Sequence, residues 1–321
     1  MIKTGVLGCA AIARRSLIPA FGAHDAFEMT AIASRSPEKA AELASQYRCR
    51  ASTYEELLAS SDIGLVYCPL PTGLHYEWVK RALLSGKHVL CEKSLACTVD
   101  EVEDLIATAR ARHLFLMESF QFRFHAQNLH VKKLLAEKRI GEVRQVSGRF
   151  GIPPFADGAT NIRYSRELGG GALLDNGAYT VKCATYLLGP EVRSLAAVCG
   201  GYDPACGGVD TVGSIMMKCG EVPVQTAYGF SHYYQNGYEI WGTEGKITTV
   251  RAFTAREDFE APVIVETAAG REERKFRDDH FARLLDHVAA TIAGGDFEAE
   301  YDECRMQARI LGEVARLGGL R

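Results

Sequence analysis

Short apolar runs alternate with helix-like segments along the first 120 residues of the chain. Each run is rich in β-branched residues and too short for a helix, so it predicts a buried strand. Strands that alternate with helices of this length indicate βαβ units and a doubly wound parallel sheet. The expected strands are Thr4–Gly8, Met29–Ser34, Ile63–Cys68, His88–Cys91 and Leu114–Glu118. The expected helices are Ile12–Gly22, Pro37–Tyr47, Tyr54–Ala59, His75–Ser85 and Val99–Arg112.

Beyond residue 120 the apolar pattern changes to alternation with period two. Such segments suit an antiparallel sheet that is covered on one face. They are Arg144–Phe150, Val192–Val198, Thr211–Lys218, Val222–Gly229 and Tyr238–Trp241, and helices are expected at Leu129–Lys138, Ala172–Leu188, His280–Ile292 and Tyr301–Leu317. We therefore expect an α/β chain with an N-terminal Rossmann domain (1–120). A C-terminal α+β domain built on a large, mostly antiparallel sheet would follow (121–321).

Composition and charge exclude several classes of protein. Hydrophobic residues make up 47% of the 321 residues and charged residues 24%, which is a globular balance rather than a disordered one. A net charge of −3 without a dense Lys/Arg block does not indicate a basic surface that would bind nucleic acid. No apolar run reaches the roughly 20 residues of a membrane helix, and the N-terminus lacks a signal-peptide core. We expect a cytoplasmic protein that binds neither nucleic acid nor membrane.

The ten cysteines are scattered along the chain without a C-x-x-C pair. This spacing argues against a zinc site and against a disulfide framework. Among the nine histidines, no pair has metal-ligand spacing with a carboxylate. We therefore expect reduced thiols and no metal.

The turn between the first strand and the first helix reads Gly8-Cys9-Ala10-Ala11-Ile12-Ala13. Its spacing is that of the dinucleotide-binding fingerprint, with alanine at the second and third glycine positions. Gly8 permits the tight turn, and the small Ala10 lets the backbone approach a pyrophosphate. The N-terminus of the following helix offers N–H groups to that anion. The residues predicted to bind the cofactor here are Gly8, Ala10, Ala11 and Ile12.

The end of the second strand distinguishes between the two nicotinamide cofactors. An enzyme that uses NAD usually places an acid there, whereas this chain has Ser34-Arg35. A hydroxyl group followed by a guanidinium fits a 2′-phosphate, and the alternative is a solvated basic turn. We expect NADP(H) rather than NAD(H).

Two further strand ends carry candidate residues. The third expected strand runs into Pro69-Leu70-Pro71, whose prolines give a rigid path, so Leu70 and Pro71 are predicted to contact the cofactor. His75 either contacts the ligand as well or caps its helix.

The next strand ends in Glu92-Lys93, and ligands of open α/β sheets bind at the carboxyl ends of the strands. Glu92 is predicted to lie beside the cofactor. Lys93 can direct its ammonium group at a bound carbonyl.

Together these motifs resemble the Gfo/Idh/MocA oxidoreductase family over nearly the whole chain. In that family the lysine at the strand end contacts nicotinamide and substrate and is required for hydride transfer, which implies this role for Lys93. Members place an aspartate on a helix of the second domain and a histidine or tyrosine four residues later, here Asp175 and Tyr179. The family usually has proline after the Glu-Lys pair. This chain has Ser94 instead, and its effect on the backbone is left open.

Within that family the chain is most similar to bacterial NDP-hexose 3-ketoreductases. The segments that carry this similarity are Gly8–Arg15, Glu118–Phe120 and Asn161–Asp175. Those enzymes use NADPH to reduce a keto group on a nucleotide-activated deoxysugar, and they also have tyrosine at the position of Tyr179. The resemblance implies the same reaction class and a homodimer or homotetramer that pairs through the C-terminal sheet.

Carbonyl reduction needs a proton donor and a positive charge beside the developing oxyanion. We expect Tyr179 to donate the proton, and Lys93 to lower the pKa of that tyrosine and to hold the oxygen. Asp175 would orient Lys93 or bind a sugar hydroxyl, while Asn176 and Arg163 would contact the substrate, Arg163 through its diphosphate. The alternatives are a core tyrosine, a helix-dipole role for the aspartate and a surface arginine.

Three functions are consistent with the sequence. The first is ketoreduction of a sugar nucleotide, the second is oxidation or reduction of a free sugar, polyol or dihydrodiol, and the third is nucleotide sensing without catalysis. The presence of Lys93, Asp175 and Tyr179 together counts against the third. The aromatic run Phe120–His125 either lines the sugar pocket or packs in the core. The identity of the sugar and nucleotide, the carbon that reacts and the direction of the reaction stay open.

Overall fold

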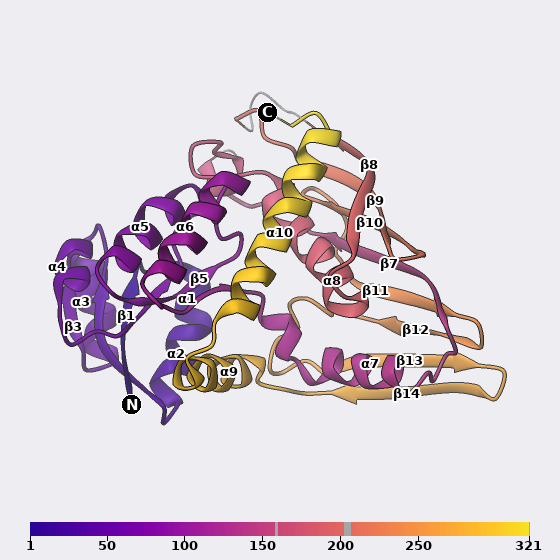
Figure 1. Ribbon diagram of the computed structural model, residues 1–321, viewed down its shortest axis with the longest axis horizontal. Coiled ribbons are helices and arrows are strands. Elements are labelled where there is room, and N and C mark those ends of the chain that lie inside the picture. Colours follow the sequence, from indigo (N-terminus) through magenta and orange to yellow (C-terminus); the bar gives the residue numbers. More distant parts are fainter. Residues whose placement is uncertain (158–159, 202–206, 321) are drawn as a thin grey trace. The chain divides into compact units, whose positions relative to one another are not determined.

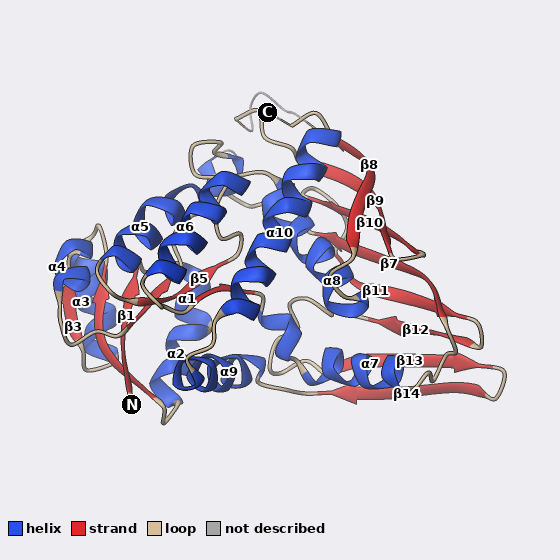
Figure 2. Ribbon diagram, in the orientation of Figure 1, coloured by secondary structure: helices blue, strands red, loops and turns tan. Residues whose placement is uncertain are grey.

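A computed structural model describes residues 1–157, 160–201 and 207–320. The first 119 residues form a six-stranded sheet in which all strands are parallel (Figures 1 and 2). Its order, β3-β2-β1-β4-β5-β6, is that of the doubly wound nucleotide-binding fold and confirms the predicted fold class. The strands are β1 (Ile2–Leu7), β2 (Phe27–Ala33), β3 (Arg50–Ser52), β4 (Leu65–Cys68), β5 (His88–Glu92) and β6 (Leu116–Ser119). The short strand β3 was not predicted, because none of its three residues is buried.

The helices of this region begin and end close to the expected positions, with one exception. They are α1 (Ala11–Arg15), α2 (Leu17–Ala23), α3 (Pro37–Gln46), α4 (Tyr54–Ala59), α5 (Thr72–Leu84) and α6 (Val99–Ala111). The prediction of one helix over Ile12–Gly22 is wrong, because two short helices meet at Ser16. Pro19 lacks an N–H group and fits only the first turn of a helix, so the chain starts a new helix at Leu17.

The last two helices are divided between two compact units of the chain. The chain divides into a first unit, Met1–Ser119 with Phe281–Ala308, and a second unit, Phe120–His280 with Arg309–Arg321. Most of α9 (His280–Gly294) and the first half of α10 (Glu298–Leu317) therefore belong to the first unit. Tyr301 in α10 donates its hydroxyl hydrogen to the carbonyl oxygen of Leu114 at 2.5 Å. Contacts of this kind link distant parts of the chain and leave no local sequence signal.

The second unit contains an eight-stranded sheet with the order β14-β13-β12-β11-β7-β10-β9-β8. Neighbouring strands are antiparallel except for β10 and β7, as predicted for a mostly antiparallel sheet. The strands are β7 (Val143–Gly151), β8 (Val192–Gly200), β9 (Val212–Cys219), β10 (Val222–Gly229), β11 (Gln235–Gly242), β12 (Gly245–Thr249), β13 (Ala261–Thr267) and β14 (Gly270–Phe276). One face is covered by α8 (Ala178–Leu188) over β7, β9 and β10, and by α7 (Ala126–Ala136) over β13 and β14 (Figure 1).

The strands β12, β13 and β14 were not predicted. Strand β14 contains alternating charges and has no buried residue, which is typical of an edge strand that resists pairing with other chains. Strand β13 begins with Ala261-Pro262, and proline in an apolar run argues against a central strand. Strands β12 and β14 thus carry little apolar signal, whereas β13 contains the apolar residues Val263–Val265 and was missed.

The other face of the sheet carries exposed apolar side chains. Val198 on β8 is 72% exposed and Met216 on β9 is 50% exposed, whereas the alternate residues Ile215 and Met217 are buried under the helices. Separately, none of the helices in the described ranges is long and apolar enough to span a membrane.

Candidate active site

The turn between β1 and α1 has the geometry predicted for a pyrophosphate-binding loop. Gly8 adopts φ +113° and donates its N–H to the carbonyl oxygen of Ala33 at 2.8 Å. A Cβ atom at Gly8 would lie 2.9 Å from Cδ2 of Leu70, so a side chain is excluded by both conformation and space. Ala11 and Ile12 are exposed on this turn, Ile12 by 53%. The helix that follows has only five residues, so its dipole is weaker than a long helix would supply.

Beyond the end of β2 the chain presents a hydroxyl group and several cations. The Oγ atom of Ser34 accepts a hydrogen bond from the N–H of Ser36 at 3.2 Å, and Arg35 is exposed. Burial raises the pKa of the nearby Cys9 thiol, while a hydrogen bond with Ser34 and the charges of Arg14 and Lys39 act in the opposite direction. The strand end therefore offers positive charge and hydrogen bonding, as a 2′-phosphate requires.

His75 does not cap α5, because the N-cap is Pro71 and no side chain bonds there. Its ring is fully buried, with Nδ1 2.8 Å from the carbonyl oxygen of Ser94 and Nε2 2.6 Å from that of Leu70. Burial, with a smaller contribution from the charge of Lys93, lowers the pKa of His75, while both carbonyl contacts act in the opposite direction. His75 thus connects the Leu70-Pro71 loop with the residue after Lys93.

At the end of β5, Glu92 and Lys93 are partly buried. The hydroxyl of Tyr67 on β4 donates to Oε1 of Glu92 at 2.7 Å. Burial raises the pKa of Glu92, and the Tyr67 hydrogen bond and the charge of Lys93 only partly offset it. Lys93 therefore follows a carboxyl group that its neighbours hold in one place.

The backbone after Lys93 is held by two side chains from flanking elements. The Lys93–Ser94 peptide bond is cis, and Ser94 is buried. The Ser94 carbonyl faces His75, and the N–H of Leu95 donates to Oε1 of Glu118 on β6 at 3.0 Å. Hydrogen bonds therefore hold the segment at the position where the family usually has proline.

Cys68, His75 and Cys91 bring three potential metal ligands within 4.8 Å of one another. Both ring nitrogens of His75 already face carbonyl oxygens. Burial also raises the pKa of Cys91 well above that of a free thiol, which disfavours the thiolate that a metal needs. The cluster is better explained as part of the packed core under the strand ends.

In the second unit, a π-helical turn, Leu173–Gly177, precedes α8, where one regular helix was predicted. Such turns are rare and are frequent at functional sites. Its first N–H group, that of Leu173, donates to Oδ2 of Asp210 at 2.8 Å. Asp210 is buried, and burial raises its pKa to about 6 despite this hydrogen bond. A carboxyl group from before β9 therefore fixes the start of the segment that carries Asp175 and Tyr179.

Asp175 forms an ion pair with Arg163, whose Nε atom lies 2.5 Å from Oδ2 of the aspartate. The charge of Asp175 raises the pKa of Arg163, and Tyr179 contributes to a smaller degree in the same direction. The structure thus brings together two residues that were predicted separately. It also places a guanidinium within electrostatic range of Tyr179.

Tyr179 lies in α8 among aromatic rings. Ring centroids lie 5.3 Å away for Phe150, 5.5 Å for Phe120, 6.0 Å for Phe253 and 6.1 Å for Phe122. Its hydroxyl oxygen is 3.2 Å from Nε2 of Gln121. The aromatic run after residue 119 therefore packs around the predicted proton donor.

Sequence comparison identifies the family. A model of the Gfo/Idh/MocA oxidoreductase family with an NAD-binding Rossmann fold matches residues 2–120, and a model of the Gfo/Idh/MocA C-terminal domain matches residues 128–248. The chain is 41% identical to a dTDP-3,4-didehydro-2,6-dideoxy-α-D-glucose 3-reductase of Saccharopolyspora spinosa, over 92% of this chain and 88% of that protein. The chain belongs to the Gfo/Idh/MocA oxidoreductase family.

Other relatives agree with this assignment. A 3-reductase of the same name from Streptomyces antibioticus is 41% identical, over 100% of this Gfo/Idh/MocA chain and 98% of the relative. The 3-ketoreductase KijD10 of Actinomadura kijaniata, solved in complex with NADP and TDP-benzene, superposes with a TM-score of 0.92. It is 36% identical, over 99% of this chain and 97% of that structure.

Several site residues of this Gfo/Idh/MocA protein were not predicted. Gln121, Glu118 and Asp210 act through contacts between distant segments, so no local motif marks them. Lys182 is buried on α8, with Nζ 5.6 Å from the ring centroid of Phe120. The spacing of three residues from Tyr179 was the available signal for it.

Asn176 was predicted to contact substrate. In the structure it is buried, and Nδ2 donates to the carbonyl oxygens of Gly229 at 3.0 Å and Phe150 at 3.3 Å. Its amide nitrogen is therefore committed to attaching the π-helical turn to β7 and β10.

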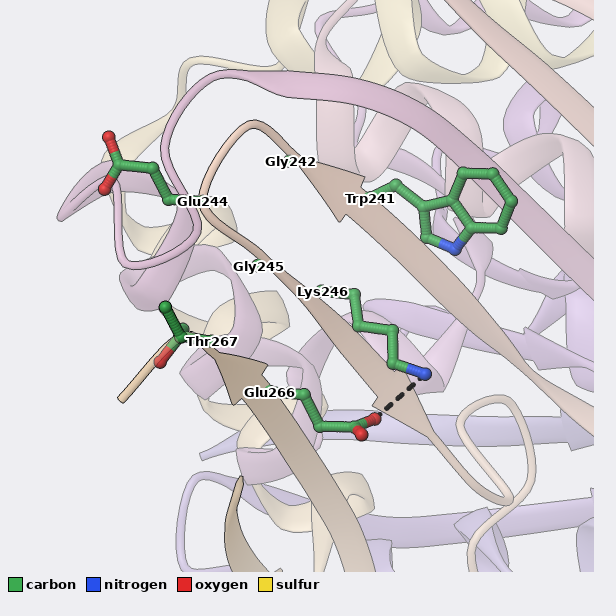
Figure 3. A pocket seen from close by; sticks show the side chains of 8 residues that line it. Trp241, Gly242, Glu244, Gly245, Lys246, Glu266 and Thr267 are labelled. Atoms are coloured by element: carbon green, nitrogen blue, oxygen red, sulfur yellow. Dashed lines mark ion pairs between the residues drawn. The ribbon is translucent and has the colours of Figure 1, made fainter. Parts of the chain in front are cut away.

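A surface hollow of about 470 Å³ lies at the β11–β12 turn and the end of β13 (Figure 3). Trp241 borders it, and Lys246 forms an ion pair with Glu266 at 2.9 Å. None of the predicted site residues lines this hollow. It is therefore separate from the candidate active site of this family member.

Proposed function

We propose that this protein is an NADP(H)-dependent ketoreductase that acts on the 3-keto group of a dTDP-activated deoxysugar. The full-length identity of 41% to two 3-reductases of such a sugar nucleotide carries the proposal. Tyr179 in its aromatic surroundings and Lys93 at the end of β5 supply the proton donor and the positive charge that the reaction requires.

The cofactor proposal is supported by residues that fit a dinucleotide with a 2′-phosphate. Gly8 leaves the space that a Cβ atom would fill, and Ala10, Ala11 and Ile12 continue the turn. Ser34 and Arg35 would hold the 2′-phosphate, because a hydroxyl and a guanidinium are there and no acid is present at the strand end. NADPH, when bound, supplies the hydride.

Each proposed catalytic residue has one task. Tyr179 would give its phenolic proton to the oxygen that becomes the alcohol, and Lys93 would stabilise the negative charge on that oxygen. The two residues lie in different units, so the proposal requires that both reach the same substrate oxygen during turnover. The Arg163–Asp175 ion pair would hold the carboxylate of Asp175 in position to bind a sugar hydroxyl.

We further propose that a second copy of the chain covers the open face of the eight-stranded sheet. Val198, Met216 and Trp241 are exposed on that face, and a sheet of this size rarely leaves such side chains in water. Sedimentation of the purified protein tests this: a monomer at micromolar concentration would contradict it. A Val198→Glu substitution is expected to weaken the association.

The function is tested by following NADPH absorbance with the 3-keto sugar nucleotide named for the relatives. We expect turnover with NADPH, slower turnover with NADH, and at most weak turnover of free sugars, polyols or dihydrodiols. Turnover of a free sugar alone would favour the dehydrogenase alternative. Thermal stabilisation by NADP⁺ without turnover of either substrate class would favour the sensing alternative.

A further inference from the structure

The hydroxyl group of Tyr179 faces both polar atoms of one amide side chain. Its oxygen lies 3.2 Å from Nε2 of Gln121 and 3.4 Å from Oε1 of the same residue. Nε2 is also 3.5 Å from the carbonyl oxygen of Phe253, a contact that fixes which end of the amide is the nitrogen. Gln121 is 8% exposed and Tyr179 7% exposed, so bulk water competes little for these contacts.

A proton donor passes through two states, and an amide can bond to both. The neutral phenol can donate its hydrogen to Oε1, whereas the phenolate, once the proton has left, can accept a hydrogen from Nε2. A carboxylate could not donate to the phenolate, and an ammonium group could not accept the hydrogen of the neutral phenol. We propose that Gln121 is a positioning residue that keeps a hydrogen bond to Tyr179 before and after the tyrosine gives up its proton. This inference rests on the function proposed above.

The surroundings of the two side chains support this role. Phe120 and Phe122, the neighbours of Gln121 in the chain, pack against the ring of Tyr179. Phe253 contributes both a ring beside Tyr179 and the carbonyl oxygen that orients the amide. The segment Phe120–Phe122 and Phe253 therefore hold both the ring of Tyr179 and the amide that faces its hydroxyl.

Charged groups of the second unit also act on Tyr179. Arg163 lies close enough that Tyr179 contributes to its raised pKa, although Asp175 is the larger cause. Asp175 precedes Tyr179 by four residues, Lys182 follows it by three, and Arg123 lies in the 3₁₀ helix Gln121–Phe124. Gln121 has no titratable group, so replacing it with an uncharged side chain removes the hydrogen bond to Tyr179 without removing a charge.

The competing explanation is that Gln121 only holds the Phe253 carbonyl in the core. Gln127 provides a matched control for this possibility. It is also buried, and its Nε2 donates to the carbonyl oxygens of Val250 at 3.0 Å and Pro262 at 2.8 Å. Its hydrogen bonds involve backbone atoms only, so loss of its amide reports the structural cost alone.

The first experiment compares the kcat of Gln121→Leu and Gln127→Leu over a range of pH. Loss of one hydrogen bond to a charged phenolate is expected to lower kcat about tenfold in Gln121→Leu. The alkaline limb of its pH profile should move up by about one unit, because the phenolate has lost a donor. KM for the sugar nucleotide should stay within about twofold of its value in the unmodified protein. Gln127→Leu should lower the unfolding temperature without moving the pH limb.

The second experiment needs no turnover. Protein labelled with ¹³C at the ζ carbon of tyrosine is titrated by NMR, and the signal of Tyr179 is the one absent from Tyr179→Phe. Gln121→Leu should raise the pKa of Tyr179, because the phenolate loses a donor, and Gln121→Glu should raise it further, because a carboxylate also adds a negative charge beside the phenolate. Gln121→Met, which is also uncharged and cannot donate a hydrogen bond, replaces Gln121→Leu if the latter fails to fold.

An unchanged pKa of Tyr179 in these variants would overturn the inference, as would an equal shift in Gln127→Leu. If the unmodified protein reduces no keto sugar but the pKa of Tyr179 shifts as expected, the proposed function fails and the Gln121–Tyr179 contact stands. If turnover is found and no shift occurs, the proposed function stands and the role of Gln121 fails.

Discussion

Lys93 and Tyr179 are held in place in different ways. Around Lys93 the neighbouring side chains bond to the main chain: His75 faces the Ser94 carbonyl and Glu118 accepts from the Leu95 N–H. Around Tyr179 the neighbours contact the functional side chain itself, through aromatic rings and the amide of Gln121. A lysine acts as a point charge on a flexible stem, so it needs a fixed base. A proton donor needs a fixed oxygen.

The largest effects should come from removing either functional group. Lys93→Ala and Tyr179→Phe are each expected to lower kcat by about 10²- to 10⁴-fold, measured with the 3-keto sugar nucleotide and NADPH. Adding a small alkylamine to each variant tests the difference between the two residues. It should restore part of the rate of Lys93→Ala, because a mobile charge is what was lost, and should have no effect on Tyr179→Phe. Equal responses of the two variants to the amine would contradict the distinction.

A substitution at the end of β2, where the cofactor is proposed to bind, should have a smaller effect on the rate and should not change proton transfer. Arg35→Asp removes a guanidinium and adds an acid at the end of β2. We expect the preference for NADPH over NADH, measured as the ratio of kcat/KM values, to fall about 10- to 100-fold. The pH profile of kcat should keep its shape, since Tyr179 is unaffected. A profile that moved would show that the two regions are not independent.

Loosening the backbone after Lys93 should have a moderate effect. His75→Leu removes the group that connects Leu70 and Ser94, so we expect kcat to fall about tenfold. Lys87→Met is the matched control, because Lys87 also donates to two carbonyl oxygens, of Ser60 and Ile63, in the same unit. It should lower the unfolding temperature and leave kcat unchanged. If both variants kept full kcat, the contacts of His75 with the backbone after Lys93 would contribute to stability and not to catalysis.

The smallest effect concerns the start of the segment that carries Tyr179. Burial raises the pKa of Asp210 from 3.8 to about 6. A group whose pKa is raised by folding stabilises the folded state at low pH, so this contribution is lost as the pH rises from about 4 to about 6. Asp210→Asn should remove that loss and raise stability at pH 7, relative to pH 4, by roughly 1–3 kcal/mol. Thermal unfolding at the two pH values measures it, and an equal change at both would exclude the buried carboxyl group as the cause.

The sequence was sufficient for the parts of the fold that depend on burial. The strands β4 and β5 and the second half of β1 are buried, so they appear as short apolar runs, and Gly8 and Lys93 could be placed after the ends of β1 and β5. Strand β14 has no buried residue and could not be recognised. The assignment of most of α9 and the first half of α10 to the first unit also depends on contacts, such as that of Tyr301 with Leu114, that local patterns do not encode.

For the candidate site, motifs identified the residues with chemical function but not those that hold them. The resemblance to the family implied Tyr179 and Asp175, whereas Arg163 as the partner of Asp175 depends on how the preceding loop folds back. A glutamine between phenylalanines looks like an ordinary core position. Gln121 acquires its importance only when α8 brings the hydroxyl of Tyr179 to it.

The position of β7 at the centre of the eight-stranded sheet has a consequence during synthesis. Its two neighbours, β10 and β11, begin at Val222 and Gln235, about 70 and 80 residues after β7 ends at Gly151. At a translation rate of about 5–20 residues per second, β7 leaves the ribosome at least several seconds before either partner exists. The nascent chain therefore carries a strand with one apolar face and both edges open, which is a substrate for chaperones and for aggregation. The yield of soluble protein should depend on the speed of translation between residues 151 and 242 more than on that of the first 119 residues.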